Sequence, residues 1–289
     1  MTQQAPGFYR RRLGDLVITV VNDGFIDLGP GTLLNIEAAE AEARLKTAIH
    51  SGFSRSSVNT FVIQGSLGGK DRTILIDTGA GDGMGPTMGR LLANLAAAGV
   101  QPGDVDMVIL THLHPDHSGN LATAGGTAVF PHAELAVAEA EAGFWLSEAT
   151  LAQAPDAMKP YVQGAQAAAA PYRERMVMSD TPAPRISRLA LHGHTPGHSG
   201  YLIDGGGQSL LIWGDLMHVP ALQAADPSVC MVYDIDAAAA EASRRRALDM
   251  ASADDMLVAG MHLDFPAFNH VVKDGPGYRL IAERWVAEV

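Results

Sequence analysis

Short apolar runs alternate along the chain with polar segments rich in glycine, proline and aspartate, the pattern of strands bounded by turns. These runs predict β-strands at Leu16–Val21, Thr60–Gln64, Thr73–Asp77, Met107–Thr111, Ala128–Phe130, Arg188–His192, Gly200–Asp204, Leu210–Trp213 and Met256–Ala259. Longer or alanine-rich segments predict helices at Ile36–His50, Pro86–Ala98, Ala133–Glu141, Ala149–Ala169 and Ala237–Ala251. This order is that of an α/β protein, and it favours two mixed sheets with helices outside them over one doubly wound sheet.

Two residues indicate where helices begin. Pro86 suits a first helical position, where its missing N–H is not needed, and Asp236 is a candidate N-cap. The alanine-rich segment at about 133–180 is interrupted by three prolines. We expect it to be a helical lid or insertion on a single domain that covers residues 1–289, rather than a separate domain.

Composition narrows the class of protein. Of the 289 residues, 47% are hydrophobic and 18% are charged, which is ordinary for a globular protein and excludes disorder, collagen and coiled coil. The net charge of 20 minus 32, or −12, disfavours nucleic acid as a partner, because phosphate binders carry a basic surface. We interpret Arg244, Arg245 and Arg246 as a solvated helix face rather than as such a surface.

Cys230 is the only cysteine, which excludes an intramolecular disulfide, multi-cysteine zinc sites and iron–sulfur clusters. No apolar run approaches the ~18 residues of a membrane span, so no membrane partner is expected. The run Leu16–Val21 follows three arginines but is too short for a signal peptide. We therefore expect a cytoplasmic protein, or a periplasmic one if the N-terminus was trimmed.

Three histidines and an aspartate follow one buried strand pattern, in the run Thr111-His112-Leu113-His114-Pro115-Asp116-His117. In an extended segment His112 and His114 point the same way, and Pro115 then turns the chain. Neutral imidazole and carboxylate are the ligands that zinc and its neighbours prefer. A merely histidine-rich polar loop would need several separate hydrogen-bond partners, so we interpret this run as a metal site.

Three more candidate ligands occur downstream, each where a strand meets a loop: His198, Asp215 and His262. Any one alone is more often a capping or core residue, but loops on a rigid scaffold commonly build a site in this way. The seven candidates suit two metal ions that share a carboxylate, roughly 3.5–4 Å apart. Five other histidines lack such a motif and are expected to be structural: His50, His132, His192, His194 and His270.

The run His112-x-His114-x-Asp116-His117, followed by His198, Asp215 and His262, resembles the metallo-β-lactamase superfamily of metallohydrolases. The resemblance implies a four-layer αββα sandwich and a dinuclear metal centre. Asp77, in Ile74-Leu75-Ile76-Asp77-Thr78-Gly79, matches a superfamily position that supports a metal ligand from behind.

Further runs resemble the methyl parathion hydrolase-like subfamily, among them Phe144-Trp145-Leu146-Ser147, Gly193-His194-Thr195-Pro196-Gly197-His198 and Trp213-Gly214-Asp215-Leu216. This resemblance implies a homodimer that hydrolyses lactones, aryl esters or phosphotriesters. The sequence departs from the organophosphate enzyme at His218, Met84, Met231 and Tyr233. A histidine at position 218 is more similar to the lactone-hydrolysing relatives, so phosphotriester cleavage is expected only as a promiscuous activity.

The resemblance suggests how the ligands divide. His112, His114 and His198 are assigned to one metal, Asp116, His117 and His262 to the other, and Asp215 bridges them. Two cations lower the pKa of a shared water toward ~7, so that a bridging hydroxide attacks the carbonyl. Zinc is the expected metal, although such His/Asp ligands also accept Mn, Fe or Co.

Beyond the ligands, His218 is a candidate for substrate orientation or proton transfer, and Tyr233 for donating its O–H to the substrate, with Asp116 also in the catalytic set. Both His218 and Tyr233 also have a plain structural interpretation. The expected substrate pocket, a small-molecule site, comprises Met84, Phe144, Trp145, His218, Met231, Tyr233 and Phe265. The apolar members are as often ordinary core.

The leading hypothesis is thus a dinuclear hydrolase of small lactones or aryl esters, and the first alternative is an acyl-homoserine lactone lactonase. A β-lactamase is disfavoured because no export signal is found. A di-iron oxidoreductase is disfavoured because such members carry a carboxylate where this chain has His114, and because a flavin domain is missing. The glycine-rich run Gly79–Gly85 lacks the spacing of a dinucleotide site.

Overall fold

Two β-sheets dominate the computed structural model, which describes residues 4–48 and 55–289. The first sheet has the strand order β1-β2-β4-β5-β6-β7-β8. Its strands are β1 (Phe8–Leu13), β2 (Leu16–Asp27), β4 (Arg55–Leu67), β5 (Lys70–Ile76), β6 (Met107–Ile109), β7 (Glu134–Ala136) and β8 (Met176–Val177). Strands β1 to β5 pair antiparallel and β5 to β8 pair parallel, so the sheet is mixed, as the sequence predicts.

The second sheet has the order β15-β14-β13-β11-β10-β9. Its strands are β9 (Ile186–Ala190), β10 (Ser199–Asp204), β11 (Ser209–Ile212), β13 (Leu257–Ala259), β14 (Phe268–Asp274) and β15 (Gly277–Ala282). Only β11 and β13 pair parallel. A short ribbon, β3 (Leu33–Leu34) with β12 (Cys230–Met231), lies apart from both sheets.

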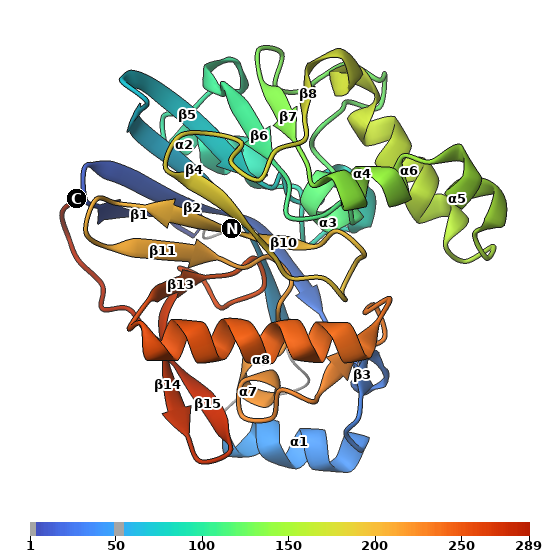
Figure 1. Ribbon diagram of the computed structural model, residues 1–289, viewed down its shortest axis with the longest axis vertical. Coiled ribbons are helices and arrows are strands. Elements are labelled where there is room, and N and C mark those ends of the chain that lie inside the picture. Colours follow the sequence, from blue (N-terminus) through green and yellow to red (C-terminus); the bar gives the residue numbers. More distant parts are fainter. Residues whose placement is uncertain (1–3, 49–54) are drawn as a thin grey trace.

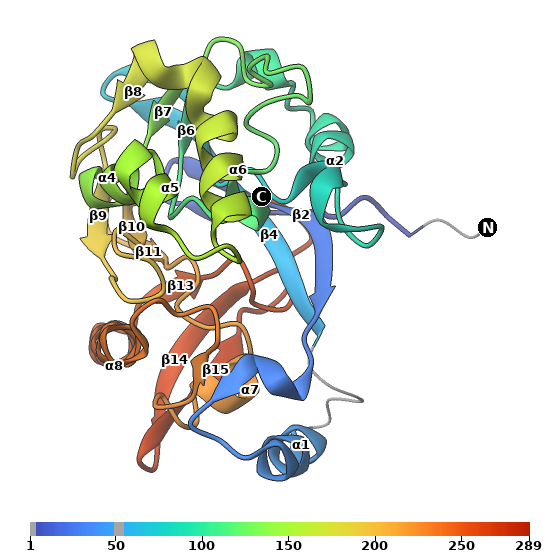
Figure 2. The ribbon, with the colours of Figure 1, turned by 90° about the vertical axis from the view of Figure 1, so that its right-hand side faces the viewer.

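The helices cover the outer faces of the two sheets (Figure 1). They are α1 (Ala38–Thr47), α2 (Leu91–Ala97), α3 (Pro115–Ser118), α4 (Glu139–Trp145), α5 (Glu148–Gln153), α6 (Lys159–Ala169), α7 (Pro220–Gln223) and α8 (Ala237–Ala253). The view in Figure 2 separates α2 and α6, beside the first sheet, from α8, beside the second. No helix in the described ranges is long and apolar enough to cross a membrane.

Alternating side chains explain the layers, because successive residues of a strand point to opposite faces of the sheet. In β5, Ile74 and Ile76 join the core between the two sheets, whereas Leu75 joins the outer core beneath α2, α4 and α6. From the second sheet, Ile203 and its cross-strand partner Leu210 share one face and join the same core. The fold is therefore the predicted αββα sandwich, with one core between the sheets and another under the helices.

Several predicted boundaries are wrong. The helix expected from Pro86 begins at Leu91, because the chain first passes through Gly89, whose φ of 84° is not helical. The segment Ala133–Glu141 is not one helix: Glu134–Ala136 forms β7, and α4 starts only at Glu139. Asp236 is an N-cap, as predicted, and its side chain accepts a hydrogen bond from the Ala239 N–H.

The segment at about 133–180 is the one that we expected to be a helical lid or insertion. It contains α4, α5 and α6, but its two ends form β7 and β8, which pair in parallel with the first sheet. Between these strands, Tyr161 of α6 lines a cavity of about 500 Å³. The flanking strands therefore anchor the helical part to the first sheet.

Arg244, expected on a solvated face, is instead fully buried on α8 at 1% exposure. Its guanidinium donates hydrogen bonds to the carbonyl oxygens of Leu216, Pro227 and Val229 and lies 3.8 Å from the Asp234 carboxylate. One guanidinium group thus donates hydrogen bonds to three loop carbonyls that lie outside helices and strands. The neighbouring Arg245 is exposed and pairs with Glu241, as expected of a solvated face.

We predict that Arg244→Met lowers the free energy of unfolding by roughly 2–5 kcal/mol, because it leaves the Leu216 and Pro227 carbonyls without a donor and the Val229 carbonyl with Gln223 alone. Urea denaturation of the metal-free protein measures the change. Arg245→Met is the matched control one residue along the same helix, and its effect should stay within about 0.5 kcal/mol. Equal losses in the two variants would contradict the role given to Arg244.

Candidate metal centre

The candidate site lies where the carboxyl ends of two parallel strand pairs meet. Asp77 follows β5, the run from Thr111 follows β6, Asp215 follows β11 and His262 follows β13. Backbone hydrogen bonds join the sheets here, from Ser199 to Thr111 and from Asn59 to Met261. Loops from both sheets therefore converge on one volume above a rigid scaffold.

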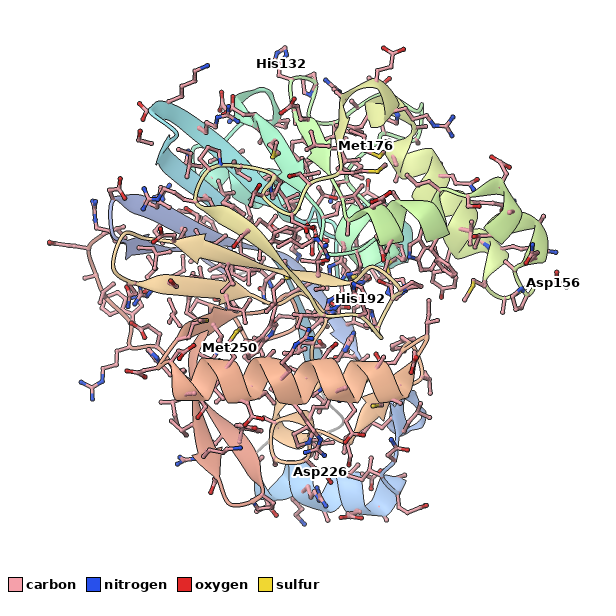
Figure 3. All side chains as sticks on the ribbon, in the orientation of Figure 1. His132, Asp156, Met176, His192, Asp226 and Met250 are labelled. Atoms are coloured by element: carbon pink, nitrogen blue, oxygen red, sulfur yellow. The ribbon has the colours of Figure 1, made fainter. Side chains whose placement is uncertain are left out.

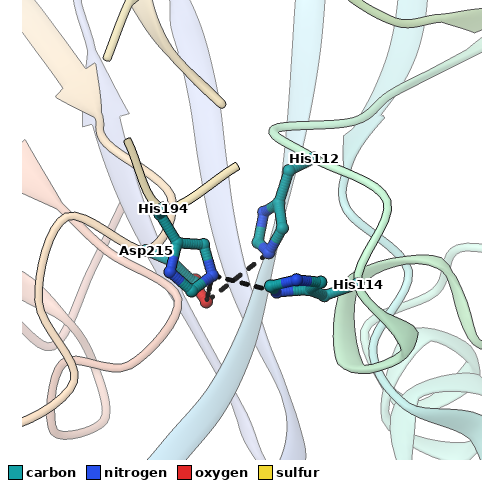
Figure 4. A group of neighbouring side chains, drawn as sticks. All are labelled: His112, His114, His194 and Asp215. Carbon is teal, nitrogen blue, oxygen red and sulfur yellow. Dashed lines mark hydrogen bonds and ion pairs between the residues drawn. The ribbon is translucent and has the colours of Figure 1, made fainter. Parts of the chain in front are cut away.

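The first ligand group consists of His112, His114, His194 and Asp215 (Figure 4). Their ligand atoms all lie within 4.8 Å of one another. His194 Nε2 is 2.9 Å from His114 Nδ1 and 3.2 Å from Asp215 Oδ2, and His112 Nε2 is 3.6 Å from the same oxygen. Three imidazoles and one carboxylate thus point at a common centre.

The second group consists of Asp116, His117, Asp215 and His262. His117 Nε2 is 3.1 Å from Asp215 Oδ1, and His262 Nε2 is 3.2 Å from Asp215 Oδ2 and 3.4 Å from Asp116 Oδ2. Pro115 begins the short helix α3, which carries Asp116 and His117. Asp215 belongs to both groups, which is the sharing that the sequence predicts.

His198 does not join either group, which corrects its assignment as a metal ligand. Its Nδ1 is 2.7 Å from the Leu191 carbonyl oxygen, and its Nε2 accepts a hydrogen bond of 2.9 Å from the Asp215 N–H. Both ring nitrogens are therefore occupied, and burial lowers the pKa of His198 to about 3. Gly214 has no side chain for this reason, because a Cβ there would lie 2.5 Å from His198 Nε2.

His194, expected to be structural, takes the place intended for His198. Its Nδ1 is 2.9 Å from Asp234 Oδ1, and the other Asp234 oxygen accepts from the Met231 N–H. The residues Gly193–His198 contain both histidines in one turn, so sequence spacing alone does not distinguish them. Asp234 distinguishes the two histidines. Its carboxylate binds Nδ1 of His194, so that Nε2 of this ring faces the ligand group.

The rings of His112, His117 and His262 are oriented in the same manner. Nδ1 of His117 lies 2.7 Å from Asp77 Oδ2, and Nδ1 of His262 lies 2.8 Å from the Ser57 carbonyl oxygen. Thr111 donates its hydroxyl to Asp77 and faces Nδ1 of His112 at 3.1 Å. Since an acceptor fixes the proton on Nδ1, the Nε2 lone pair of each ring is left for a metal. Asp77 thus lies where we expect it, behind His117.

Buried polar atoms without hydrogen-bond partners show that the two ligand groups are suited to cations. In the described part of the chain, His112 Nε2, His117 Nε2 and Asp215 Oδ1 are buried and make no hydrogen bond. Such atoms are costly to bury unless something binds them. Burial alone would lower the pKa of His262, but Asp215 and Asp116 raise it to about 10. The carboxylates thus favour positive charge at this point, which divalent ions supply.

A cavity of about 500 Å³ opens above the two ligand groups. Ligand residues form its floor, together with His218, whose Nε2 is 3.0 Å from Asp215 Oδ2 and whose Nδ1 is buried without a hydrogen-bond partner. Its wall is mainly apolar and comprises Ile26, Leu28, Met84, Trp145, Ala157, Met158, Tyr161, Val232, Tyr233 and Ile235. The site therefore combines a charged floor with an apolar wall.

The predicted pocket residues divide into two sets. Met84, Trp145, His218 and Tyr233 line the cavity. Phe144, Met231 and Phe265 do not: Met231 is fully buried in a small core with α1 and α7, Phe144 packs against the outer core, and Phe265 is 40% exposed elsewhere. Sequence reasoning missed Met158, Tyr161, Val232 and Ile235, because the positions of α6 and the loop after β12 depend on tertiary packing.

The other histidines lie away from the ligand groups. His132 is exposed at the upper end of the molecule in Figure 3, and His192 is exposed where β9 leads into the histidine-bearing turn. His270 pairs with Glu283, with Nε2 2.6 Å from the carboxylate. His50 falls outside the described residues. The structural interpretation therefore suits His132, His192 and His270.

Three solved structures show how far the architecture is shared. The crystal structure of hydrolase AbOPH in the beta lactamase superfamily is 31% identical, with a TM-score of 0.91 over 98% of this chain and 100% of that one. AidC, a dizinc quorum-quenching lactonase, is 24% identical with a TM-score of 0.90, over 97% and 98% of the chains. A quorum-quenching N-acyl homoserine lactone lactonase is 19% identical with a TM-score of 0.58, over 90% and 100%.

Curated relatives match only a short part of the chain. Metallo-beta-lactamase domain-containing protein 1 of Rattus norvegicus is 49% identical over 65 residues, 22% of this chain and 22% of the relative. The Homo sapiens protein of that name is 49% identical over 57 residues, 19% and 20% of the two chains. The chain thus matches about a fifth of the length of these relatives.

The family model of the metallo-beta-lactamase superfamily matches residues 54–262, a range that begins just before β4 and ends at His262. Both ligand groups lie inside this range. The chain therefore belongs to the metallo-beta-lactamase superfamily.

Proposed function

We propose that the protein is a hydrolase that uses a pair of divalent metal ions to open small, neutral lactones or aryl esters. The observation that carries the proposal is the sharing of Asp215 by two ligand groups on the floor of an apolar cavity. The likeness to hydrolase AbOPH over nearly the whole chain supports the hydrolase class.

His112, His114 and His194 would hold one ion, Asp116, His117 and His262 the other, and Asp215 both. Zinc is the ion we propose, since this donor set of imidazole and carboxylate suits it; the set also accepts Mn, Fe or Co. When bound, such a pair supplies Lewis acidity, which lowers the pKa of water and polarises the carbonyl under attack. No serine nucleophile is required.

His218 and Tyr233 are the residues of this chain that would handle the substrate. His218 lines the cavity with its Nε2 3.0 Å from Asp215 Oδ2, so its ring would orient the substrate or protonate the leaving oxygen above the two ligand groups. Tyr233 lines the cavity 6.3 Å from the His218 ring, measured between centroids, and is 43% exposed. Its O–H can therefore donate to a substrate oxygen at the mouth.

The side chains that line the cavity favour an uncharged substrate. Among the described residues that line it, none is a lysine or an arginine. An anionic substrate, such as a β-lactam carboxylate, would find no cationic side chain there, whereas a neutral lactone, aryl ester or phosphotriester needs none. The apolar wall also favours the alternative of an acyl-homoserine lactone, whose acyl chain it can cover.

The homodimer, the cytoplasmic location and the promiscuous phosphotriesterase activity stay predictions from the sequence. Sedimentation equilibrium tests the homodimer, because it measures the mass of the particle, which should be that of two chains of 289 residues.

We expect metal-reconstituted protein to cleave dihydrocoumarin, an acyl-homoserine lactone or an aryl ester much faster than methyl parathion. A chelated sample is the control, and metal content is quantified in parallel. Turnover should fall to background in the chelated sample, because the ions supply the electrophile. Two bound ions with no cleavage of any of the four compounds would refute the substrate class while leaving the metal site intact.

We predict that His194→Ala lowers the metal content from two ions to one, because it removes a ligand from the first group. His198→Ala should keep two ions but lose roughly 1–3 kcal/mol of stability, since it leaves the Asp215 N–H unpaired. Elemental analysis after dialysis measures the metal, and urea denaturation measures stability. The reverse result, with His198→Ala losing an ion and His194→Ala keeping both, would restore the assignment made from the sequence.

We predict that His218→Leu leaves the metal content at two ions but shifts the preference from lactone toward phosphotriester. The ratio of kcat/KM for dihydrocoumarin to that for methyl parathion should fall at least tenfold, a change of ~1.4 kcal/mol. The expectation follows from loss of the imidazole that lines the cavity beside Asp215. An unchanged ratio would remove His218 from the mechanism.

A further inference from the structure

Glu141 is a fully buried carboxylate on α4 that none of the steps above uses. One of its oxygens, Oε1, accepts a hydrogen bond of 2.9 Å from the Leu113 N–H. The other, Oε2, accepts from the Thr195 hydroxyl at 2.7 Å and from the Gly197 N–H at 2.9 Å. The carboxylate thus receives three hydrogen bonds from two different segments.

Both segments carry ligands of the first group. Leu113 lies between His112 and His114 in the chain, and Thr195 directly follows His194. His114 and His194 are 80 residues apart in sequence, yet Nδ1 of the first lies 2.9 Å from Nε2 of the second. One side chain therefore links the two loops that must be in register for three imidazoles to meet.

Helix α4 packs closely against the segment that contains His194 and Gly197. A Cβ at Gly197 would lie 2.1 Å from the Glu141 backbone nitrogen, so the turn and the helix are in direct backbone contact. Trp145, four residues later on α4, packs edge-on to the His114 ring with centroids 5.3 Å apart. The helix therefore touches both segments at once, and its carboxylate is anchored between them.

We propose that Glu141 is a positioning residue for the first metal site, holding His112 and His114 in register with His194. This inference rests on the proposed metal pair and concerns one of its two sites. The second group draws on α3 and the loop after β13, and none of the hydrogen bonds of Glu141 reaches those residues. Loss of the carboxylate should therefore weaken one site and spare the other.

A carboxylate is required at this point because all three partners are donors. In Glu141→Gln, one oxygen becomes an NH₂ group that faces either the Leu113 N–H or the Thr195 and Gly197 donors. Two donors then meet without an acceptor in a buried place, which is costly. Thr195→Val is the milder change, because it removes only one of the three donors.

Co²⁺ titration of the metal-free protein, followed by absorption spectroscopy and competition with a chelator, tests the proposal. We expect the wild type to bind two ions. Glu141→Gln should bind one of them about 10–100-fold more weakly, the usual effect of removing a group that supports a ligand, and the other with unchanged affinity. Thr195→Val should shift the same site in the same direction by a smaller factor.

Asp23→Asn is the matched control, because Asp23 is also a fully buried carboxylate that accepts backbone N–H bonds, from Ala80 and Leu91. It touches neither of the segments that Glu141 joins. We expect it to lower stability without weakening the site that Glu141→Gln weakens. If Glu141→Gln leaves the dissociation constants of both cobalt ions unchanged, or weakens both sites equally, Glu141 has no site-specific role and the inference is wrong.

Hydrogen exchange in the metal-free protein gives a second, independent readout. The Leu113 and Gly197 amides should exchange at least tenfold faster in Glu141→Gln than in the wild type, whereas Asp23→Asn should leave them unchanged. If Glu141→Gln fails to fold, Thr195→Val carries the same measurement at Gly197. Fewer than two cobalt ions in the wild type would instead overturn the proposed metal pair, so the two failures are distinguishable.

Discussion

The sharing of one buried carboxylate by several imidazoles is the constraint on which the site depends. Asp215 is 3% exposed, and its oxygens lie within 3.6 Å of ring nitrogens of His112, His117, His194, His218 and His262. A charge in that position is costly unless it is compensated on every side. The fold provides this compensation by placing the ends of both sheets around a single residue, and His198 holds the backbone of that residue in place.

Much of the architecture follows from local patterns that a sequence displays. Strand β5 is a short apolar run, and its alternation decides which of its side chains enter the core between the sheets. The run from His112 to His117 also follows from its spacing at a strand end. These features depend on neighbours within a few residues, so they can be recognised without tertiary information.

Other features depend on contacts between distant residues, and the sequence does not display them. His194 and His198 share one turn, and the choice between them is made by Asp234 and by the Asp215 N–H. Burial of Arg244 depends on carbonyls from three different loop positions. In the segment predicted as the helix Ala133–Glu141, pairing with β6 and β8 outweighs the helical propensity of alanine, so its first residues become a strand.

The distribution of ligands along the chain has a consequence for synthesis of the protein. His112 and His114 leave the ribosome early, together with the strands of the first sheet, but Asp215 and His262 belong to the second sheet. Since chains emerge from the N-terminus onward, the first sheet can collapse while its histidines still lack the carboxylate that the two metal sites share. The two ligand groups are therefore complete only after His262 has emerged, so the site closes late, once the two sheets have docked.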